Sequence, residues 1–561
     1  MAPIIIPLPR MRIVRIPAPF MTLLRSTLLL LCLLLAVPVL GVLGAWLALD
    51  EAALGVLRHQ WETVLPGYAG QSLVLALGVG LGVMVLGSAT AAAVTLFEFP
   101  GRRVFEWALL LPLAMPAYVL AYAWTDALQF SSPLHGALRE LVGTPRALWP
   151  DVRSLPFAVA RCVLCLYPYV YLLTRAALGE RAVRMMEAAR LLGAPMRRRV
   201  LEVALPMARP AIAAGTALAL METLADYGVG SYFGLTTFST GIYKAWLVMN
   251  DRVAAAQLAS ILLVVVAALL LAERAAQQRL RFAGSKTAAQ GTEARPHRLH
   301  GAAAVAAIAL CALPVLLGFV LPVLWLGHGV WNEWAHGEFG LPWERFWRWS
   351  LASFQLAALA AVVATGLSLA LAFVLRGGAR GLLGRLLSAA ARVLSLGYAV
   401  PGAVIAVGIL LPVGWLQQQW PGAGVTAVVT GTALGLVYAY LVRFTAVALQ
   451  SVEAGYARVP LSVDETARML GSPPGRTFLA LHLPLLRRSA GAAALLVFVD
   501  VMKELPATLV LRPFGSDTLA VVAYNLARDE RLAEAALPSL AIVAVGLLPV
   551  ILLSRALRAD P

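Results

Sequence analysis

Four acidic side chains interrupt apolar stretches of the chain at a repeated spacing. Glu222 and Asp226 lie in ARPAIAAGTALALMETLADYGVG, and Asp500 and Glu504 lie in a second apolar segment. Each pair is spaced i and i+4, which on a helix places both carboxylates on one face. An acid inside a membrane costs about 2.5 to 3.5 kcal/mol on insertion scales, so acids in a membrane span indicate a pathway or a ligand site.

Carboxylates, together with a phenol such as Tyr227, are hard oxygen ligands that suit a hard cation such as ferric iron. We therefore predict an acidic ring that attracts a cation. Two structural alternatives stay open: the acids pair with Lys503, Arg512 or helix ends, or they lie in a wet outer opening. The 7 histidines form no cluster in the sequence, and we assign no metal ligands among them.

The acids need apolar helices to hold them, and the composition supplies such helices. The 561-residue chain is 60% hydrophobic and 13% charged, with a mean hydropathy of +0.81. A water-soluble core cannot bury that much apolar surface, so we predict an all-α polytopic membrane protein. Twelve apolar runs are long enough to span a bilayer, at 27–49, 72–97, 105–126, 155–178, 207–230, 256–273, 302–326, 351–375, 386–411, 424–449, 489–511 and 537–557.

The twelve runs form two sets of six. They predict a first half at 1–278 and a second half at 301–561, joined by a polar linker at 279–300. The run at 27–49 follows several arginines, as a signal peptide does, but its length favours an uncleaved first span.

Basic residues gather in alternate connections between the runs. Because positive loops stay on the cytoplasmic side, both termini are predicted to be cytoplasmic. The net charge of +16 falls in short clusters and not in one patch, which argues against a nucleic-acid partner.

A charged stretch recurs in both halves, as EAARLLGAPMRRRVLEVALP at 187–206 and ETARMLGSPPGRTFLALHLP at 465–484. The residues that recur at one constant spacing are Glu187, Ala189, Gly193, Leu205 and Pro206 in the first copy, and Glu465, Ala467, Gly471, Leu483 and Pro484 in the second. Both copies are cytoplasmic in the predicted orientation, so an even number of spans separates them. The halves are therefore predicted to be parallel repeats.

Each copy is predicted to form two short helices at an angle. Ser462 stands three residues before Glu465, the spacing of a capping box. Gly471 and Gly193 suit the left-handed residue that ends a helix. Amphipathic elbows resting on the membrane surface are the structural alternative.

The repeated pattern resembles the EAA loop of the membrane subunits of bacterial ABC importers. In that family the loop docks into a cleft on the cytoplasmic ATPase and transmits its closure to the membrane helices. The resemblance implies coupling loops at 181–206 and 458–484. The coupling residues it implies are Glu187, Ala188, Ala189, Gly193, Pro206, Glu465, Thr466, Ala467, Gly471 and Pro484. Thr466 stands where the family prefers alanine.

Nucleotide chemistry is missing from the chain. No G-x-x-x-x-G-K-[ST] loop occurs, and GSPPGRT at 471–477 has the wrong spacing and an arginine in place of the lysine. We therefore expect no cofactor on this chain, with ATP and Mg on a separate ATPase, a pair of identical subunits. No nucleophile, base and orienting group converge, which argues against an enzyme. A secondary transporter or channel would need no ATPase, and the two repeated stretches argue against that class.

Two longer segments, 222–259 and 502–538, resemble fused ferric-iron importer permeases, and the similarity covers nearly the whole chain. The resemblance implies a type I ABC importer fold and import of ferric iron across the bacterial inner membrane by alternating access. It also implies a periplasmic or extracellular iron-binding protein that docks on the outer loops at 231–255, 327–350 and 512–536. Import of thiamine, a polyamine or another small cation by the same architecture is the alternative.

Several further residues have two interpretations. Pro116 and Pro401 bend apolar runs, which suits either a gate or static packing. The tryptophans of 327–350 suit an interfacial belt or a docking site. Cys162 and Cys165 form a C-x-x-C without a strand or loop, and we interpret them as packing residues.

Overall fold

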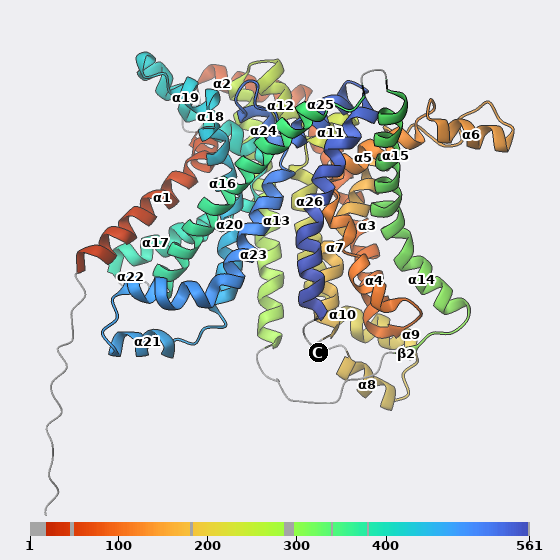
Figure 1. Ribbon diagram of the computed structural model, residues 1–561, viewed down its shortest axis with the longest axis horizontal. Helices are drawn as coiled ribbons and strands as arrows, with labels where there is room; N and C mark the ends of the chain where they lie inside the picture. Colours follow the sequence, from red (N-terminus) through yellow and green to blue (C-terminus); the bar gives the residue numbers. More distant parts are fainter. Residues whose placement is uncertain are drawn as a thin grey trace, which may run out of the picture.

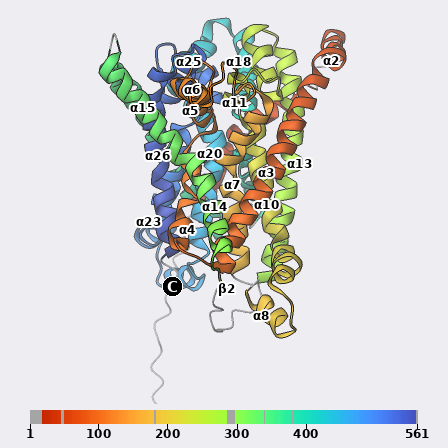
Figure 2. The same ribbon diagram turned by 90° about the vertical axis from the view of Figure 1, so that its right-hand side faces the viewer.

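The computed structural model describes residues 18–44, 46, 50–179, 183–284, 297–337, 340–378 and 381–558. Long helices run between two ends of the molecule (Figures 1 and 2). The short helices α8 and α21 project at one end, named here the α8/α21 end, and α6 and α19 lie at the other, the α6/α19 end. Helix α1 begins and α26 ends at the α8/α21 end. Three of the arginines that precede the first apolar run, Arg10, Arg12 and Arg15, lie outside the described residues.

The elements before the linker are α1 (Ala18–Gly44), α2 (Glu51–Thr63), α3 (Leu65–Leu96), β1 (Phe97–Glu98), α4 (Arg102–Ala108), η2 (Leu111–Ala114), α5 (Ala117–Leu128), α6 (Pro133–Val142), α7 (Leu155–Ala177), α8 (Val183–Leu191), α9 (Met196–Arg198), η4 (Arg199–Ala204), α10 (Leu205–Ala225), α11 (Gly228–Tyr232), α12 (Phe238–Tyr243), η5 (Lys244–Val248) and α13 (Arg252–Gly284). Helix α13 continues past residue 279, so it includes the first residues of the predicted linker.

The elements after the linker are β2 (His297–Arg298), α14 (Ala302–Val315), η6 (Leu316–Val320), α15 (Leu321–His336), α16 (Trp343–Arg376), α17 (Gly381–Leu394), η7 (Gly397–Ala399), α18 (Gly402–Gln419), η8 (Pro421–Ala423), α19 (Val425–Gly431), α20 (Ala433–Tyr456), α21 (Ser462–Met469), α22 (Pro474–Thr477), η9 (Phe478–His482), α23 (Leu483–Met502), α24 (Pro506–Leu511), α25 (Leu519–Arg528) and α26 (Leu532–Arg558). Strands β1 and β2 pair in parallel, which holds the end of the linker against the end of α3.

The apolar runs form membrane-length helices, as predicted. Among the described residues, 10 helices are long and apolar enough to cross a membrane, or up to 11 if one bent pair counts as a single span. The expected number was twelve. Helix α23, in the eleventh predicted run, carries Arg487, Arg488 and Asp500 and falls outside that set.

The predicted third and ninth runs are broken helices. Between α4–η2 and α5 the chain bends by 91°, and Pro116 is the residue that caps α5. Pro401 occupies the same position before α18, with the same backbone angles as Pro116. Proline suits a helix start because it has no N–H to leave unpaired. The helix is therefore interrupted at both prolines, and the gate role of these residues stays a prediction.

Two sets of three helices form the centre of the molecule, α3 with α7 and α10, and α16 with α20 and α23. Glycines allow the close packing in the first set. A Cβ atom on Gly87 of α3 or Gly215 of α10 would lie 2.6 Å or 2.7 Å from atoms of Val170 on α7. Small residues let membrane helices approach closely, because packing is their main source of attraction in lipid.

The outer helices interlock the two predicted halves. Helix α1 packs on α17 and α18, and α13 packs on α18, although α1 and most of α13 precede the linker. In the other direction, α15 contacts α5, and α26 contacts η2. The first and last spans of each set therefore pack against the other set, and the division at 279–300 stays a prediction about the sequence.

The contact between α1 and α18 depends on Gly408. A Cβ atom there would lie 2.1 Å from the carbonyl oxygen of Pro38. Replacing Gly408→Val is expected to push α1 away and destabilise the protein by roughly 1–3 kcal/mol, the usual cost of overpacking. The thermal unfolding midpoint of the detergent-solubilised protein measures this.

Gly366→Val in α16 is the matched control, because nothing lies within 4 Å of a Cβ atom at Gly366. Equal unfolding midpoints for the two variants would contradict the packing of α1 on α18.

Candidate translocation cavity and coupling helices

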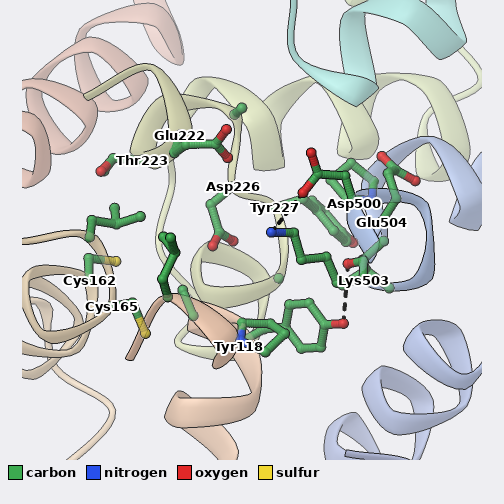
Figure 3. A pocket seen from close by; sticks show the side chains of 18 of the residues that line it. Tyr118, Cys162, Cys165, Glu222, Thr223, Asp226, Tyr227, Asp500, Lys503 and Glu504 are labelled. Carbon is green, nitrogen blue, oxygen red and sulfur yellow. Dashed lines mark hydrogen bonds and ion pairs between the residues drawn. The ribbon is translucent and has the colours of Figure 1, made fainter. Parts of the chain in front are cut away.

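All four predicted acids line one cavity of about 130 Å³ between the central helices. Glu222 lies in the last turn of α10 and Asp500 in the last turn of α23. Asp226 and Glu504 follow the ends of the same two helices. Figure 3 shows the four carboxyl groups around this cavity, together with Tyr227 and Lys503. The four predicted acids therefore lie together, and their role in a translocation path stays a prediction.

The prediction that each pair lies on one helix face is wrong. Helices α10 and α23 end at Ala225 and Met502, between the two acids of each pair. Asp226 instead accepts a hydrogen bond from the backbone N–H of Val229 at 2.8 Å, at the start of α11.

Glu504 has the equivalent position at the start of α24. It accepts hydrogen bonds from the backbone N–H groups of Ala507 at 3.0 Å and Thr508 at 3.1 Å, and from the Thr508 hydroxyl at 2.7 Å. The first N–H groups of a helix have no partner within the helix, so a carboxylate there is stabilised. The helix break is thus what allows two acids per half inside an apolar bundle.

Two cations share the cavity with the acids. Lys503 Nζ lies 2.9 Å from Asp500 Oδ1, which is the pairing that the structural alternative foresaw. Arg443 of α20 lies between two acids, with Nη1 3.2 Å from Glu504 Oε1 and Nη2 4.0 Å from Glu222 Oε2. Arg512, the other predicted partner, pairs with Asp517 instead.

Sequence analysis missed Arg443. The signal was available, because a charged residue within the apolar run at 424–449 is as costly as an acid there. Because Arg443 and Lys503 pair with the acids, the carboxylates are not arranged as a metal site in this conformation. Among the described residues, no group of three or more His, Cys, Asp or Glu side chains is arranged to hold a metal ion.

Tyrosines cover the cavity on the side of α11 and α25. Tyr227 lines the cavity and stacks on Tyr243 with ring centroids 3.8 Å apart. Its hydroxyl lies 3.3 Å from the hydroxyl of Tyr524 in α25. Cys162 and Cys165 are buried, and both line the cavity. We interpreted these cysteines as packing residues, and the sequence did not predict that they lie in the cavity wall beside the acids (Figure 3).

A second cavity of about 930 Å³ extends from the acids toward the α8/α21 end. It shares Tyr169, Tyr398, Asp500 and Lys503 with the first cavity. Its other wall residues include Arg274, Glu453 and Val550 near the α8/α21 ends of α13, α20 and α26. Asp500 and Lys503 therefore border open space on the α8/α21 side, while tyrosines pack over the first cavity on the opposite side.

The two repeated stretches form the predicted pairs of short helices. The first copy contains α8, Gly193 with φ 80°, and then α9, and the second contains α21, Gly471 with φ 73°, and α22. A left-handed residue favours glycine, which explains the recurring glycine. Each copy then enters a membrane helix through a π-helical segment, η4 or η9, and Pro206 and Pro484 occupy the same place in the first turns of α10 and α23.

The predicted capping box is absent. Helix α21 begins at Ser462, and the Ser462 hydroxyl does not cap it; its backbone carbonyl accepts a hydrogen bond from Thr466 instead. The bend after Pro460 places Leu461 at the cap, so Ser462 lies inside the helix.

Both short helices project from the molecule with exposed apolar tips (Figure 1). Leu191 and Leu192 are 89% and 87% exposed, and Met469 and Leu470 at the corresponding places are 81% and 79% exposed. Glu187 and Glu465, with the neighbouring Ala188 and Thr466, are exposed on the same helices. Paired exposed apolar groups next to charged ones are typical of a protein-binding surface.

The two short helices are attached to the bundle by different chemistry. Asp464 of α21 accepts a hydrogen bond from Arg376 Nε at 2.7 Å and lies 2.9 Å from His482 Nε2. The other His482 nitrogen lies 3.0 Å from the Tyr456 hydroxyl. In the first half the repeat-related residues are Met186, Ala204 and Leu178, which are buried and apolar.

The outer tryptophans lie at the α6/α19 end, in α15 and at the start of α16. Trp331, Trp334, Trp343 and Trp347 are each at least half exposed. Exposure suits both predicted roles, the interfacial belt and the docking site, and does not separate them.

The Asp464 contacts give a prediction about the attachment of α21. Asp464→Asn removes the charge that pairs with Arg376, and loss of one partner of a buried pair costs about 3 kcal/mol. Trypsin is therefore expected to cleave at Arg468 and Arg476 several-fold faster in this variant. The measurement is the rate of these cuts in the folded, detergent-solubilised protein.

Glu465→Gln is the control. Glu465 is the next acid of the same helix, and its side chain is exposed. Equal cleavage rates in the two variants would refute the anchoring role of Asp464.

The chain matches known transport proteins. Residues 83–282 match the family described as binding-protein-dependent transport system inner membrane component. An Fe(3+)-transport system permease protein of Haemophilus influenzae is 24% identical over 495 residues, covering 86% of this chain and 88% of that protein. A putative 2-aminoethylphosphonate transport system permease protein of Salmonella choleraesuis is 26% identical over 247 residues, 41% of this chain and 86% of that protein.

A second putative 2-aminoethylphosphonate permease protein, from Salmonella typhimurium, is 28% identical over 162 residues, 29% of this chain and 59% of that protein. All of these relatives are described as transport permeases and none as an enzyme. The matched family segment contains the first cavity acids and the first repeated stretch, from α8 to α10. Residues 83–282 therefore belong to the binding-protein-dependent, ABC-type class of membrane permeases, and the chain as a whole is similar to a permease of that class.

Proposed function

We propose that the chain is the membrane-spanning permease of an ATP-driven importer that carries ferric iron across the inner membrane. The observation that carries the proposal is the cavity in which four carboxylates from both predicted halves meet. Carboxylate oxygens suit a hard trivalent cation, and the chain is similar over most of its length to an Fe(3+)-transport permease.

Transport in this proposal proceeds by alternating access. The α8/α21 end, where α1 begins and α26 ends, faces the cytoplasm, and the cavity that opens there makes this the inward-facing conformation. Tyr227, Tyr243 and Tyr524 close the path to the outside. Opening of the outer side would separate these tyrosines, which come from α11, α12 and α25.

The partners follow from the two ends. Helices α8 and α21 with their exposed apolar tips dock on a cytoplasmic ATPase, one on each of two identical subunits, and ATP and Mg bind there. Pro206 and Pro484 stand where each stretch becomes a membrane helix, so movement of α8 or α21 passes directly to the helix that carries Glu222 or Asp500. An iron-binding protein docks at the α6/α19 end.

A second candidate cargo is a zwitterion that has a cationic and an anionic group. Arg443 and Lys503 in the cavity supply positive charge that a bare cation does not need. Relatives described as 2-aminoethylphosphonate permeases match parts of this chain. Thiamine or a polyamine is the remaining alternative, from the same architecture.

The experiment that tests the cargo is uptake of labelled ferric iron by iron-starved cells with and without the chain, with its partner proteins present and other iron routes disabled. Loss of uptake without the chain, restored on re-expression, is expected. Unchanged uptake would exclude iron as the cargo. The same cells would then be tested with labelled 2-aminoethylphosphonate, thiamine and a polyamine.

The cavity acids are expected to be necessary for cargo passage. Replacing all four by their amides, as Glu222→Gln, Asp226→Asn, Asp500→Asn and Glu504→Gln, should lower iron uptake by at least tenfold because the path loses its negative charge. Binding of the ATPase, measured by co-purification, should persist. Glu62→Gln on the exposed surface of α2 is the control, and wild-type uptake by the fourfold variant would leave the acids with a structural role only.

The two glycines give a test of the coupling role. Gly193→Val and Gly471→Val put a β-branched residue where φ is positive, which costs roughly 1–2 kcal/mol for each position and distorts the turn. The double variant is expected to hydrolyse ATP without transport, measured as the ratio of the two rates in proteoliposomes. Gly475→Val is the matched control, since Gly475 has open space around it and no positive φ. Coupled transport by the double variant would disprove the assignment.

A further inference from the structure

Arg443 occupies the centre of the cavity between acids of the two predicted halves. Its side chain is buried, with the residue 8% exposed, and it lines the cavity from the middle of α20. The guanidinium lies 3.2 Å from Glu504 and 4.0 Å from Glu222, and its Nε has no hydrogen-bond partner. Its only charged contacts within 4.0 Å, among the described residues, are therefore two carboxylates.

The repeat shows that the fold does not need this arginine. The spacing that relates Glu222 to Asp500 relates Cys165 to Arg443 and Ala225 to Lys503. The acids of the cavity recur in both halves, whereas both cations come from the second half alone. Helix α7 has the same neighbours as α20, a long span and the acid-bearing helix, and packs there with Cys165.

The acids do not need Arg443 for their own hydrogen bonds either. Glu504 already accepts two backbone N–H groups and the Thr508 hydroxyl at the start of α24. A buried guanidinium is expensive to desolvate, and a buried ion pair gives little net stability. A role in the transport cycle explains the position better than a role in folding.

We propose that Arg443 is a tethered counter-cation that competes with a cationic cargo for Glu222 and Glu504, an inference that rests on the carboxylate path of the proposed function. In the conformation described here, Arg443 pairs with these two acids and Lys503 pairs with Asp500. Three of the four cavity acids thus already have a cationic partner, so the cavity holds a cation weakly and the cargo leaves toward the α8/α21 end.

The two halves carry different members of the ion pairs, and this explains how Glu222 is released from Arg443. Glu222 belongs to α10 in the first predicted half, while Arg443 and Glu504 belong to the second. A relative movement of the halves that opens the α6/α19 end separates Glu222 from Arg443 and frees its carboxylate. The same ion pair that ejects the cargo inward therefore breaks when the outer side opens.

The test measures binding of Tb³⁺ to the complete chain with its ATPase in lipid nanodiscs without nucleotide. Tb³⁺ is a hard trivalent cation that prefers oxygen ligands, and excitation of Tyr118, Tyr169 and Tyr398 in the cavity wall sensitises its luminescence. The wild-type protein is expected to bind it weakly in the cavity. Arg443→Gln is expected to bind at least tenfold more tightly, and Arg443→Lys, which keeps a cation, to bind as the wild type.

Two variants separate this effect from general changes. Glu222→Gln combined with Glu504→Gln on the Arg443→Gln background should abolish the gain. Arg175→Gln is the matched control, because it breaks an arginine–glutamate pair of similar length, 3.3 Å to Glu106, that does not line the cavity. This control should bind Tb³⁺ as the wild type does.

The proposal is overturned if Arg443→Gln binds Tb³⁺ within twofold of the wild type, or if the gain persists without the two acids. Weaker binding of 2-aminoethylphosphonate by Arg443→Gln, without a gain for Tb³⁺, would also overturn it and make Arg443 a contact for an anionic cargo group. Absence of iron uptake by the wild type, together with the Tb³⁺ gain, would remove iron as the cargo while the counter-cation role stands.

Discussion

Charge inside an apolar helix bundle is the constraint on which the rest of this structure depends. Each of the four carboxylates is costly in lipid unless a cation or a backbone donor lies close to it. The bundle meets this requirement in two ways, by ending α10 and α23 between the acids and by bringing Arg443 and Lys503 to the same cavity. The first solution determines where α10 and α23 end. The second determines where side chains of the two halves meet.

The helix breaks also define the direction of access. Asp226 and Glu504 accept hydrogen bonds from the first turns of α11 and α24, which begin two residues after each acid, at Gly228 and Pro506. The chain turns there, and Tyr227 packs against Tyr243 and Tyr524. The larger cavity opens on the other side of the acids, toward the α8/α21 end. An acid next to a helix start thus places a carboxylate in the cavity and also positions the turn that closes the outer side.

The repeat is symmetric in backbone and asymmetric in chemistry. The short helices, their positive-φ glycines and the π-helical entries recur in both halves. The attachment of α21 uses Arg376, Asp464 and His482, while the attachment of α8 uses buried apolar side chains. The cavity follows the same rule, since its acids recur and its cations do not. A fused chain permits this divergence because each half can change independently, which two copies of one half-sized chain cannot do.

The amino-acid sequence alone determined the membrane class, most of the spans, the repeated stretches with their glycine breaks, and the four acids, because apolar length, spacing and costly intramembrane charge are local properties of the chain. Tertiary structure decided what those charges meet. Arg443 lies in a different helix from Glu222, and only the cavity that both side chains line reveals the pair. The interlocking of α1 and α13 with the second half likewise depends on contacts between distant segments. An i,i+4 spacing cannot report a helix end that an acid itself stabilises by capping the next helix.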